Sequence, residues 1–391
     1  MPKNTKTADS NIENSSLEST PSFEVALSEL ESLVQQMESD QMPLEQSLAA
    51  YKRGTDLLRF CQKTLADVEQ QVRILDDKNQ LQTYTDSEDW IIAMTDFTAW
   101  ALDIQRRTEH TLDQLLPQVN IAPQRLHDAM RYALLGGGKR VRALLVHASG
   151  SLCNANADKV DIAASAVEMI HAYSLVHDDM PCMDDDDLRR GKPSCHKQYD
   201  DATALLVGDA LQTLAFQTLA TAEKSLGFSP EQQLKMLSTL AIASGSRGMA
   251  GGQAIDLASV SKELTQLELE YMHIHKTGAL IRAAALLGAY CADQEDGAKI
   301  SAIHQYSESI GLAFQVVDDI LDTEADTATL GKTAGKDADS NKPTYVTILG
   351  LARAKSLANE LYENALDVLK PFGDEALRLR QLAQFIMQRS F

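Results

Sequence analysis

The sequence predicts an all-α protein, because apolar residues recur with helical spacing from Phe97 almost to the C-terminus. Neither a β-hairpin turn nor a run of alternating strand residues is recognisable. Breaks rich in Gly, Pro and Asp divide this region into helices near residues 117–123, 154–158, 181–184, 227–230, 293–297, 323–343 and 371–374. A helical bundle is therefore the expected architecture of residues 97–391.

Length and composition narrow the possible functions. The chain has 391 residues, a net charge of −20 and 44 % hydrophobic residues, which allows two globular domains. An acidic surface repels nucleic acid and anionic membranes, so we expect no direct nucleic-acid binding. The five cysteines lack the spacing of a metal site, and no apolar run reaches 18 residues. These features predict a cytoplasmic protein without a membrane span.

The N-terminal part divides into a tail, a helical pair and a linker. Residues 1–21 are rich in Ser, Thr and Asn, and we expect them to be a disordered tail. Two apolar stripes with spacings of three and four follow, one from Phe23 and one ending near residue 76. We therefore expect a helical hairpin, or coiled coil, over residues 22–77 and a linker over residues 78–96. So small a hairpin usually needs a partner. The alternative is that it packs on the rest of the chain or self-associates.

Six aspartates lie within ten residues, namely Asp178, Asp179, Asp184, Asp185, Asp186 and Asp187. Grouped carboxylates suit Mg²⁺, and the two arginines that follow, Arg189 and Arg190, suit a phosphate held beside the metal. Pro181 should end the helix near Asp179 and return Asp184 on the next turn. The alternative is a solvated charge run at a helix end. We expect the last three aspartates of the group to be solvated or to support the metal ligands without binding the metal directly.

A second acidic group, Asp318, Asp319 and Asp322, lies inside an apolar stretch. Asp318 and Asp322 are four residues apart, so they share one face of a helix. Burying two unpaired carboxylates among apolar residues is costly, and a bound cation is the simplest remedy. The second group therefore weakens the interpretation of the first as a solvated run.

A glycine-rich turn at 136–138 leads into Lys139 and Arg142. It is not a Walker P-loop, because Arg follows the lysine where Ser or Thr is required. Its backbone N–H groups could still face a phosphate, and Lys139 and Arg142 are three residues apart on one side of a helix. His171 lies seven residues before Asp178, on the same helical face. The alternatives are a plain surface turn and an ordinary structural histidine.

The two acidic motifs, Asp-Asp-x4-Asp-x4-Arg-Arg-Gly and Phe-Gln-x2-Asp-Asp-x2-Asp, resemble those of the trans-isoprenyl diphosphate synthases, in particular the bacterial farnesyl diphosphate synthases. Further matching segments stand in order at 136–142, 208–211, 251–256, 275–278, 331–332 and 341–345. The resemblance covers about residues 97–391. It implies an all-helical enzyme, with a homodimer formed through this part of the chain.

The resemblance also implies a reaction and a set of site residues. Dimethylallyl or geranyl diphosphate would condense with isopentenyl diphosphate to give farnesyl diphosphate, with three Mg²⁺ ions in each active site. The expected metal ligands, which are also catalytic, are Asp178, Asp179, Asp184, Asp318, Asp319 and Asp322. The residues expected to hold the isopentenyl diphosphate are Lys139, Arg142, His171 and Arg190. The residues expected to hold the allylic diphosphate are Arg189, Lys276, Thr277, Gln315, Lys332 and Lys342, and Lys276 is expected to be catalytic as well.

Tyr173 is the residue expected to set product length. It lies five residues before Asp178, one to two turns deeper on the same helix, where an aromatic ring can block a growing chain. With the Pro181-Cys182 insertion, this position resembles the farnesyl pattern and not the geranylgeranyl one. The alternatives are simple core packing of Tyr173 and a geranylgeranyl diphosphate synthase.

Residues 22–77 contain segments at 22–34, 42–48, 51–54 and 68–75 that together resemble the small subunit of exodeoxyribonuclease VII. The resemblance implies a non-catalytic helical partner for the large nuclease subunit. Residues 1–92 hold 8 Lys/Arg and 17 Asp/Glu, which disfavours contact with DNA by this segment itself.

Two other functions fit part of the pattern. Terpene cyclases share the first acidic motif, but the second Asp-Asp motif and the Lys139–Arg142 pair favour chain elongation. A non-enzymatic scaffold for a nuclease, carrying a degraded synthase, is disfavoured because the motifs are intact.

Overall fold

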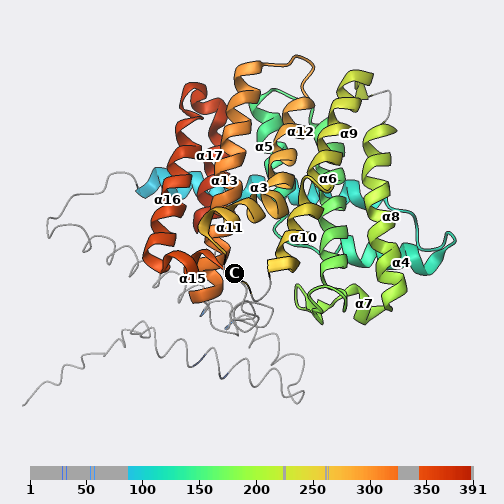
Figure 1. Ribbon diagram of the computed structural model, residues 1–391. Helices are drawn as coiled ribbons and strands as arrows, with labels where there is room; N and C mark the ends of the chain where they lie inside the picture. The colour runs from blue at the N-terminus through green and yellow to red at the C-terminus, as the bar shows by residue number, and fades with distance from the viewer. Residues whose placement is uncertain are drawn as a thin grey trace, which may run out of the picture. The chain divides into compact units, whose positions relative to one another are not determined.

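The computed structural model describes residues 87–222, 226–259, 262, 264–324 and 343–388, together with Glu29, Ser32, Arg53 and Leu57. The chain forms two compact units, Met1–Glu88 and Asp89–Phe391. The described residues of the second unit are drawn in colour in Figure 1.

Little of the first unit is described, but one contact there bears on the predicted hairpin. Arg53 and Glu29 are both helical, and the Arg53 Nε donates to the Glu29 Oε1 at 2.7 Å. Leu57, one turn after Arg53, is buried. Glu29 and Arg53 come from the two segments predicted to form the hairpin. The tail predicted at 1–21 lies outside the described residues.

The described part of the second unit is built almost entirely from helices, as the sequence predicts. Their bounds are α3 (Ser87–Leu115), α4 (Gln124–Leu134), α5 (Val141–Leu152), α6 (Ala157–Asp178), α7 (Cys195–Gln198), α8 (Asp201–Ala220), α9 (Pro230–Ser244), α10 (Met249–Ser259), α11 (Gln266–His273), α12 (Ala279–Tyr290), α13 (Gly297–Glu324), α15 (Tyr345–Leu349), α16 (Leu351–Asp367) and α17 (Leu377–Gln388). A π-helical segment, η2 (Ile274–Gly278), joins α11 to α12, and a 3₁₀ segment, η3 (Lys370–Ala376), precedes α17. Helix α3 begins at Ser87, within the range 78–96 that was expected to be a linker.

Helix α12 lies in the middle of the bundle with α5 beside it. Helices α6, α8 and α9 lie on one side of this pair, and α13, α16 and α17 lie on the other (Figure 1). Every residue of α12 except Arg282 is buried. The close approach of α5 and α12 requires glycine, because a Cβ at Gly288 would lie 2.1 Å from the Val146 carbonyl oxygen. Tight packing of this kind fixes the central helices against which the site is built.

Polar side chains begin several helices at the predicted breaks. Asn156 accepts from the backbone N–H of Asp158 at the start of α6, and Asp200 accepts from Thr203 at the start of α8. Ser229 forms a capping box with Gln232 at the start of α9. These contacts satisfy backbone N–H groups that the first helical turn leaves without partners.

The expectation of a chain without a β-hairpin is wrong at one place. Strands β1 (Leu188–Arg189) and β2 (Lys192–Pro193) pair antiparallel through a two-residue turn. Arg190 and Gly191 occupy this turn with φ of 54° and 73°. An Arg-Gly turn with positive φ at both positions closes such a hairpin, but it lacks the Asn-Gly or Asp-Gly that usually signals one. Among the described helices, none is both long and apolar enough to cross a membrane.

Candidate functional site

The first acidic group lies where α6 ends. Asp178 is the last residue of α6 and Asp179 is its C-cap, so the helix ends where Pro181 predicts. The chain then folds back, because the Asp184 N–H donates to the Asp178 carbonyl at 2.9 Å. The Asp186 N–H donates to the Asp179 carbonyl at 3.1 Å. The turn therefore returns Asp184 next to Asp178, as expected.

Asp178 has an unfavourable electrostatic environment. Burial, with smaller contributions from Asp184 and Asp179, raises the pKa of its carboxyl group to about 6, although Lys276 and Arg189 oppose the shift. A carboxylate that loses water and faces another carboxylate gains most from a nearby cation. Oxygen donors so arranged have the chemistry that Mg²⁺ prefers.

Asp179 and Arg189, which were expected to hold a metal and a diphosphate, contact each other. The Asp179 side chain is almost completely buried, and its two carboxylate oxygens accept from the Arg189 Nε at 3.0 and 3.1 Å. Asp186 lies 3.5 Å from the Arg189 Nη2. Arg189 thus carries a fixed positive charge at the edge of the first acidic group.

The second acidic group lies near the C-terminal end of α13. Asp318 and Asp322 are half-buried and four residues apart, and the Gln315 Nε2 donates to the Asp318 Oδ2 at 3.3 Å. Asp319 is buried, and its Oδ2 accepts from the backbone N–H of Tyr345 at 2.7 Å. Asp319 therefore ties α13 to the start of α15.

Lys276 and Thr277 lie on the π-helical segment η2, which packs against both α10 and α13. The Lys276 Nζ donates to the Asp256 Oδ2 at 2.5 Å and also lies close enough to lower the pKa of Asp178. A Cβ at Gly252 would lie 2.1 Å from the Lys276 N, so α10 approaches η2 closely. Single π-helical turns occur often at functional sites because they displace a side chain from its helical position.

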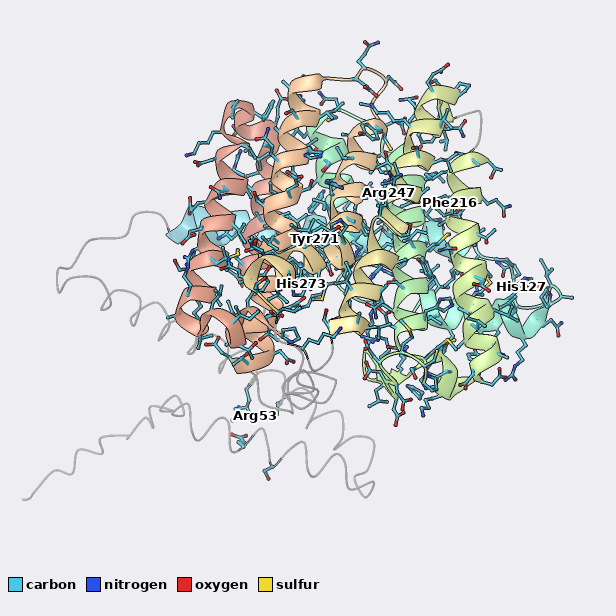
Figure 2. All side chains as sticks on the ribbon, in the orientation of Figure 1. Arg53, His127, Phe216, Arg247, Tyr271 and His273 are labelled. Carbon is cyan, nitrogen blue, oxygen red and sulfur yellow. The ribbon has the colours of Figure 1, made fainter. Side chains whose placement is uncertain are left out.

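Beside Lys276, His273 of α11 is buried and stacks on the Tyr345 ring with 5.5 Å between centroids. Burial, with the Lys276 charge, lowers the pKa of His273 to about 4. Figure 2 labels His273 and Tyr271 in the same part of the bundle. A neutral imidazole therefore fills the space between η2 and α15 at neutral pH.

Arginines surround His171 on α6. Burial lowers the pKa of His171 well below its usual value, and Arg142, Arg190, Arg140 and Arg189 lower it further. The imidazole is thus neutral at neutral pH. A cavity beside it is lined by Gly136, His171, Asp179, Arg189, Arg190 and Cys195, among others.

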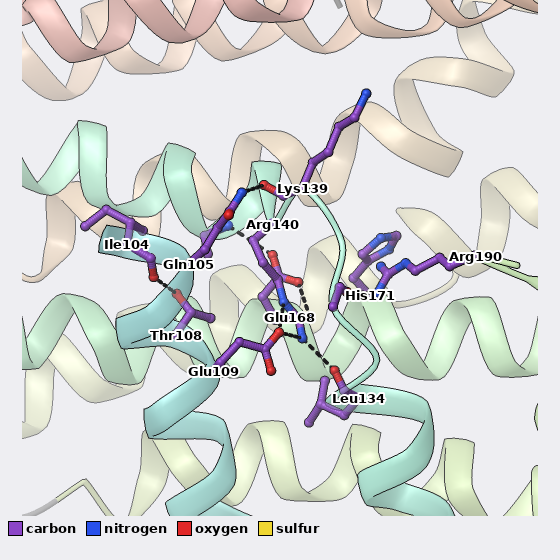
Figure 3. A network of polar contacts seen from close by, with 12 residues as sticks. Ile104, Gln105, Thr108, Glu109, Leu134, Lys139, Arg140, Glu168, His171 and Arg190 are labelled. Atoms are coloured by element: carbon purple, nitrogen blue, oxygen red, sulfur yellow. Dashed lines mark hydrogen bonds and ion pairs between the residues drawn. The ribbon is translucent and has the colours of Figure 1, made fainter. Parts of the chain in front are cut away.

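The glycine-rich turn approaches Arg190 closely. The Arg190 Nη1 donates to the Gly137 carbonyl oxygen, and a Cβ at Gly138 would lie 2.7 Å from the Arg190 Cζ. Gly137 and Gly138 also have φ of 79° and 117°, where other residues are strained. Figure 3 shows Arg190 and His171 together on one side of the turn, while the Lys139 side chain extends away from the network.

Tyr173 lies on α6 below Asp178, as predicted, and is buried. Its ring packs edge-on against His177 with 5.7 Å between centroids, and burial raises the pKa of its hydroxyl while Gln212 of α8 lowers it. His177 in turn fits against α8 at Gly208, where a Cβ would lie 1.9 Å from the imidazole Nε2. Lys332 and Lys342, predicted to hold the allylic diphosphate, lie outside the described residues.

Two polar clusters were not assigned from the sequence. Asp185, Asp187 and the buried His196 place ligand-type atoms within 4.8 Å of one another, and both aspartates are exposed. Arg140 points inward from the glycine-rich turn and bonds two glutamates. The second cluster could have been suspected from the unusual Lys-Arg-Val-Arg run, but the sequence does not show which arginine turns inward.

Comparisons with known proteins agree with this geometry. The polyprenyl synthetase family model matches residues 123–376, and the exonuclease VII small subunit model matches residues 23–74. A farnesyl diphosphate synthase of Haemophilus influenzae is 46 % identical over 297 residues, covering 76 % of this chain and 99 % of that protein. The farnesyl diphosphate synthase of Escherichia coli is 49 % identical, covering 67 % of this chain and 89 % of its own length.

Solved structures give the same result. An FPP/GFPP synthase from Zymomonas mobilis is 39 % identical with a TM-score of 0.67, covering 75 % of this chain and 99 % of that chain. A geranyltransferase from Helicobacter pylori, complexed with magnesium and isoprenyl diphosphate, is 29 % identical with a TM-score of 0.66, covering 79 % of this chain and 98 % of that chain. This chain therefore belongs to the polyprenyl synthetase family and carries, ahead of that region, a segment that matches the exonuclease VII small subunit.

Proposed function

We propose that the chain is a magnesium-dependent prenyltransferase that condenses dimethylallyl or geranyl diphosphate with isopentenyl diphosphate to give (2E,6E)-farnesyl diphosphate. One observation carries the proposal. Lys276 lies close enough to Asp178 to change its pKa, while the π-helical segment that holds Lys276 packs on α13, which bears Asp318. The names of the relatives that are 46 % and 49 % identical support the same chemistry.

Mg²⁺ fits the acidic residues by donor chemistry, because Asp178 and Asp184 offer hard oxygen donors at a place where burial disfavours the charge of Asp178. The proposed ligands are Asp178 and Asp184 on one side and Asp318 and Asp322 on the other. Asp179 and Asp319, which bond Arg189 and the Tyr345 N–H, are proposed to contribute mainly by holding these groups in place. We assign three ions to the site. When bound, Mg²⁺ neutralises the negative charge that develops on a leaving diphosphate.

The cationic side chains hold the two substrates. Arg189, Lys276, Thr277 and Gln315, with Lys332 and Lys342, are assigned to the allylic diphosphate. Lys139, Arg142 and Arg190 are assigned to the isopentenyl diphosphate, and the neutral His171 can donate one hydrogen bond to it.

The reaction breaks the allylic C–O bond, and the electron pair leaves with the diphosphate. The isopentenyl double bond then attacks C1 of the allylic cation, and the released diphosphate takes the proton that is lost. Lys276 and Arg189 stabilise charge on the leaving group as it develops, since fixed cations in a partly buried site need no reorganisation. Apolar walls must exclude water, which would otherwise capture the cation.

The test is a product assay. Purified full-length protein is incubated with Mg²⁺, geranyl diphosphate and isopentenyl diphosphate, and the prenyl product is sized. We expect a C15 product. No elongation, or a cyclic hydrocarbon, contradicts the proposal and favours a scaffold or a cyclase.

Tyr173 is proposed to limit product length, since it is buried below Asp178 between α6 and α8. Replacing Tyr173 by Ala removes the ring and should lengthen the product towards C20, measured in the same assay. A matched control is Tyr290→Ala, which removes a buried ring of α12 and should leave the product at C15. An unchanged C15 product from Tyr173→Ala contradicts the assignment.

Two partners belong to the proposal. We propose a homodimer through the synthase part, supported by large apolar side chains exposed on α8 and α9, namely Leu205, Leu206, Leu234 and Ile242. We also propose that residues 22–77 bind the large subunit of exodeoxyribonuclease VII, supported by the family match at 23–74. Sedimentation of the purified chain tests the first proposal, and copurification with that large subunit tests the second.

A further inference from the structure

The geometry points to Arg140 as a positioning residue for the isopentenyl diphosphate site, fixed by Glu109 and Glu168 and not itself a substrate ligand. This inference rests on the proposed function, which assigns Lys139 and Arg142 to that diphosphate. Arg140 stands directly after Lys139 and two residues before Arg142 in the sequence. The structure gives it a different set of contacts.

The Arg140 guanidinium is held by three parts of the bundle. Its Nε and Nη2 donate to the Glu109 Oε1 of α3 at 2.9 and 2.5 Å, and its Nη1 donates to the Glu168 Oε2 of α6 at 2.9 Å. Its Nη2 also donates to the Leu134 carbonyl at the end of α4, at 2.6 Å. Figure 3 shows these contacts converging on the guanidinium. One planar side chain thus joins α3, α4 and α6 at a single point.

The positive charge of Arg140 is buried and paired inside the protein. The Arg140 side chain is 2 % exposed and that of Glu168 is 1 % exposed. Burial lowers the pKa of Arg140, but the charges of Glu168 and Glu109 outweigh it and raise the pKa overall. Because two carboxylates already pair with the guanidinium, its positive charge is neutralised and does not attract a further anion. A buried group of this kind is costly to build, so a role other than binding must account for it.

The backbone of the turn is fixed at the same place. Arg140 has φ of 49°, in the left-handed region that residues with a Cβ rarely adopt. The Gln105 Nε2 donates to the Lys139 carbonyl oxygen at 3.0 Å. The Ala143 N–H donates to the Glu168 Oε1 at 3.1 Å, so one glutamate holds both the guanidinium and the first turn of α5. Observed strain of this kind, held by surrounding contacts, often marks a functional site.

The strained residue sets where its neighbours lie. With Arg140 turned inward, the Lys139 side chain extends in the opposite direction (Figure 3). Arg142 follows in the first turn of α5, which Glu168 fixes, and Arg142 lies close enough to His171 to lower its pKa. Binding groups need support that holds them to about 0.5 Å, and Arg140 supplies this support from inside.

The experiment measures steady-state prenyl transfer by the full chain carrying Arg140→Lys. Lysine keeps the charge but cannot reach both glutamates and the Leu134 carbonyl. We expect KM for isopentenyl diphosphate to rise about tenfold, since small displacements of binding groups have large kinetic effects. KM for geranyl diphosphate should stay within about twofold. Glu109→Ala is the second variant, because Glu109 is the more exposed partner and the chain should tolerate its loss.

The matched control is Lys159→Met, because Lys159 lies on α6, the helix that also carries Glu168. Lys159 is also a buried cation paired with a carboxylate, Asp293, but it lies about 28 Å along the helix axis from Asp178. We expect this variant to lower the thermal unfolding temperature without changing either KM. If Arg140→Lys and Glu109→Ala leave KM for isopentenyl diphosphate unchanged, or if Lys159→Met raises it equally, the positioning role is wrong.

Lys139→Ala and Arg142→Ala separate the inference from the proposal beneath it. If both raise KM for isopentenyl diphosphate and Arg140→Lys does not, only the role of Arg140 fails. If neither Lys139→Ala nor Arg142→Ala raises KM for isopentenyl diphosphate, the assignment of this site is wrong, and the positioning role of Arg140 is refuted as well.

Discussion

The two acidic groups contain the same Asp-Asp pair on different backbones. The first pair lies where α6 ends and the chain turns back, and the second lies within α13. In both, the second aspartate is buried against a partner, Arg189 for Asp179 and the Tyr345 N–H for Asp319. In both, the first aspartate is only half-buried. We infer that the first aspartate of each pair faces the proposed metal site, while the second anchors the surrounding structure.

Removing the first aspartate of either pair should have the largest effect. Asp178→Ala or Asp318→Ala should lower turnover about 100-fold or more, because one fixed electrostatic contact in a transition state is worth about 3–4 kcal/mol. Asp185→Asn is the control, since Asp185 is exposed and asparagine tolerates its φ of 49°. Near-normal turnover of Asp178→Ala in the product assay would refute the assignment.

The region around Asp319 in α13 should also lose stability in acid because of His273. This histidine stacks on the ring of Tyr345, whose backbone N–H bonds Asp319. The pKa of His273 is about 4 in the folded chain, below its ordinary 6.5, so the unfolded chain binds the proton first as pH falls. Stability is therefore lost between about pH 6.5 and 4, by about 3 kcal/mol relative to His273→Gln. Urea unfolding of both proteins at pH 7.5 and 4.5 measures this difference. Parallel stability curves would contradict it.

The second aspartates should matter for stability. Asp179→Ala and Asp319→Ala each leave a buried or half-buried donor without its acceptor, and each should lower the free energy of unfolding by about 1–3 kcal/mol. Asp178→Ala should leave that free energy equal or higher in EDTA, because burial already disfavours the Asp178 charge. Urea unfolding measures all three variants. A loss of stability in Asp178→Ala that equals the loss in Asp179→Ala would remove the distinction.

The sequence predicts the helical class, the end of α6 near Asp179 and the shared face of Asp318 and Asp322, because these follow from local spacing and from Pro181. It also leads to the family, because the motifs occur in order. These predictions need only residues that are close in the chain.

The features that were missed depend on distant residues. Arg140 meets Glu109 and Glu168, which are 31 and 28 residues away, and no local pattern shows that its side chain turns inward. Asp179 and Arg189 were both expected to bind ligands, and their mutual contact depends on the turn and on the β1–β2 hairpin. The charged residues of a motif therefore predict that a site is present. Which of them bind the ligand and which hold the others in place can be seen only in the folded structure.

The most direct test is the Mg²⁺ concentration that gives half-maximal prenyl transfer, measured with geranyl and isopentenyl diphosphate. Asp178→Asn should raise this concentration about tenfold or more, because Asp178 is assigned to the metal. Asp179→Asn should leave it within about twofold, since its carboxylate bonds Arg189. An equal shift in both variants, or a larger one in Asp179→Asn, would contradict the division of roles within the pair.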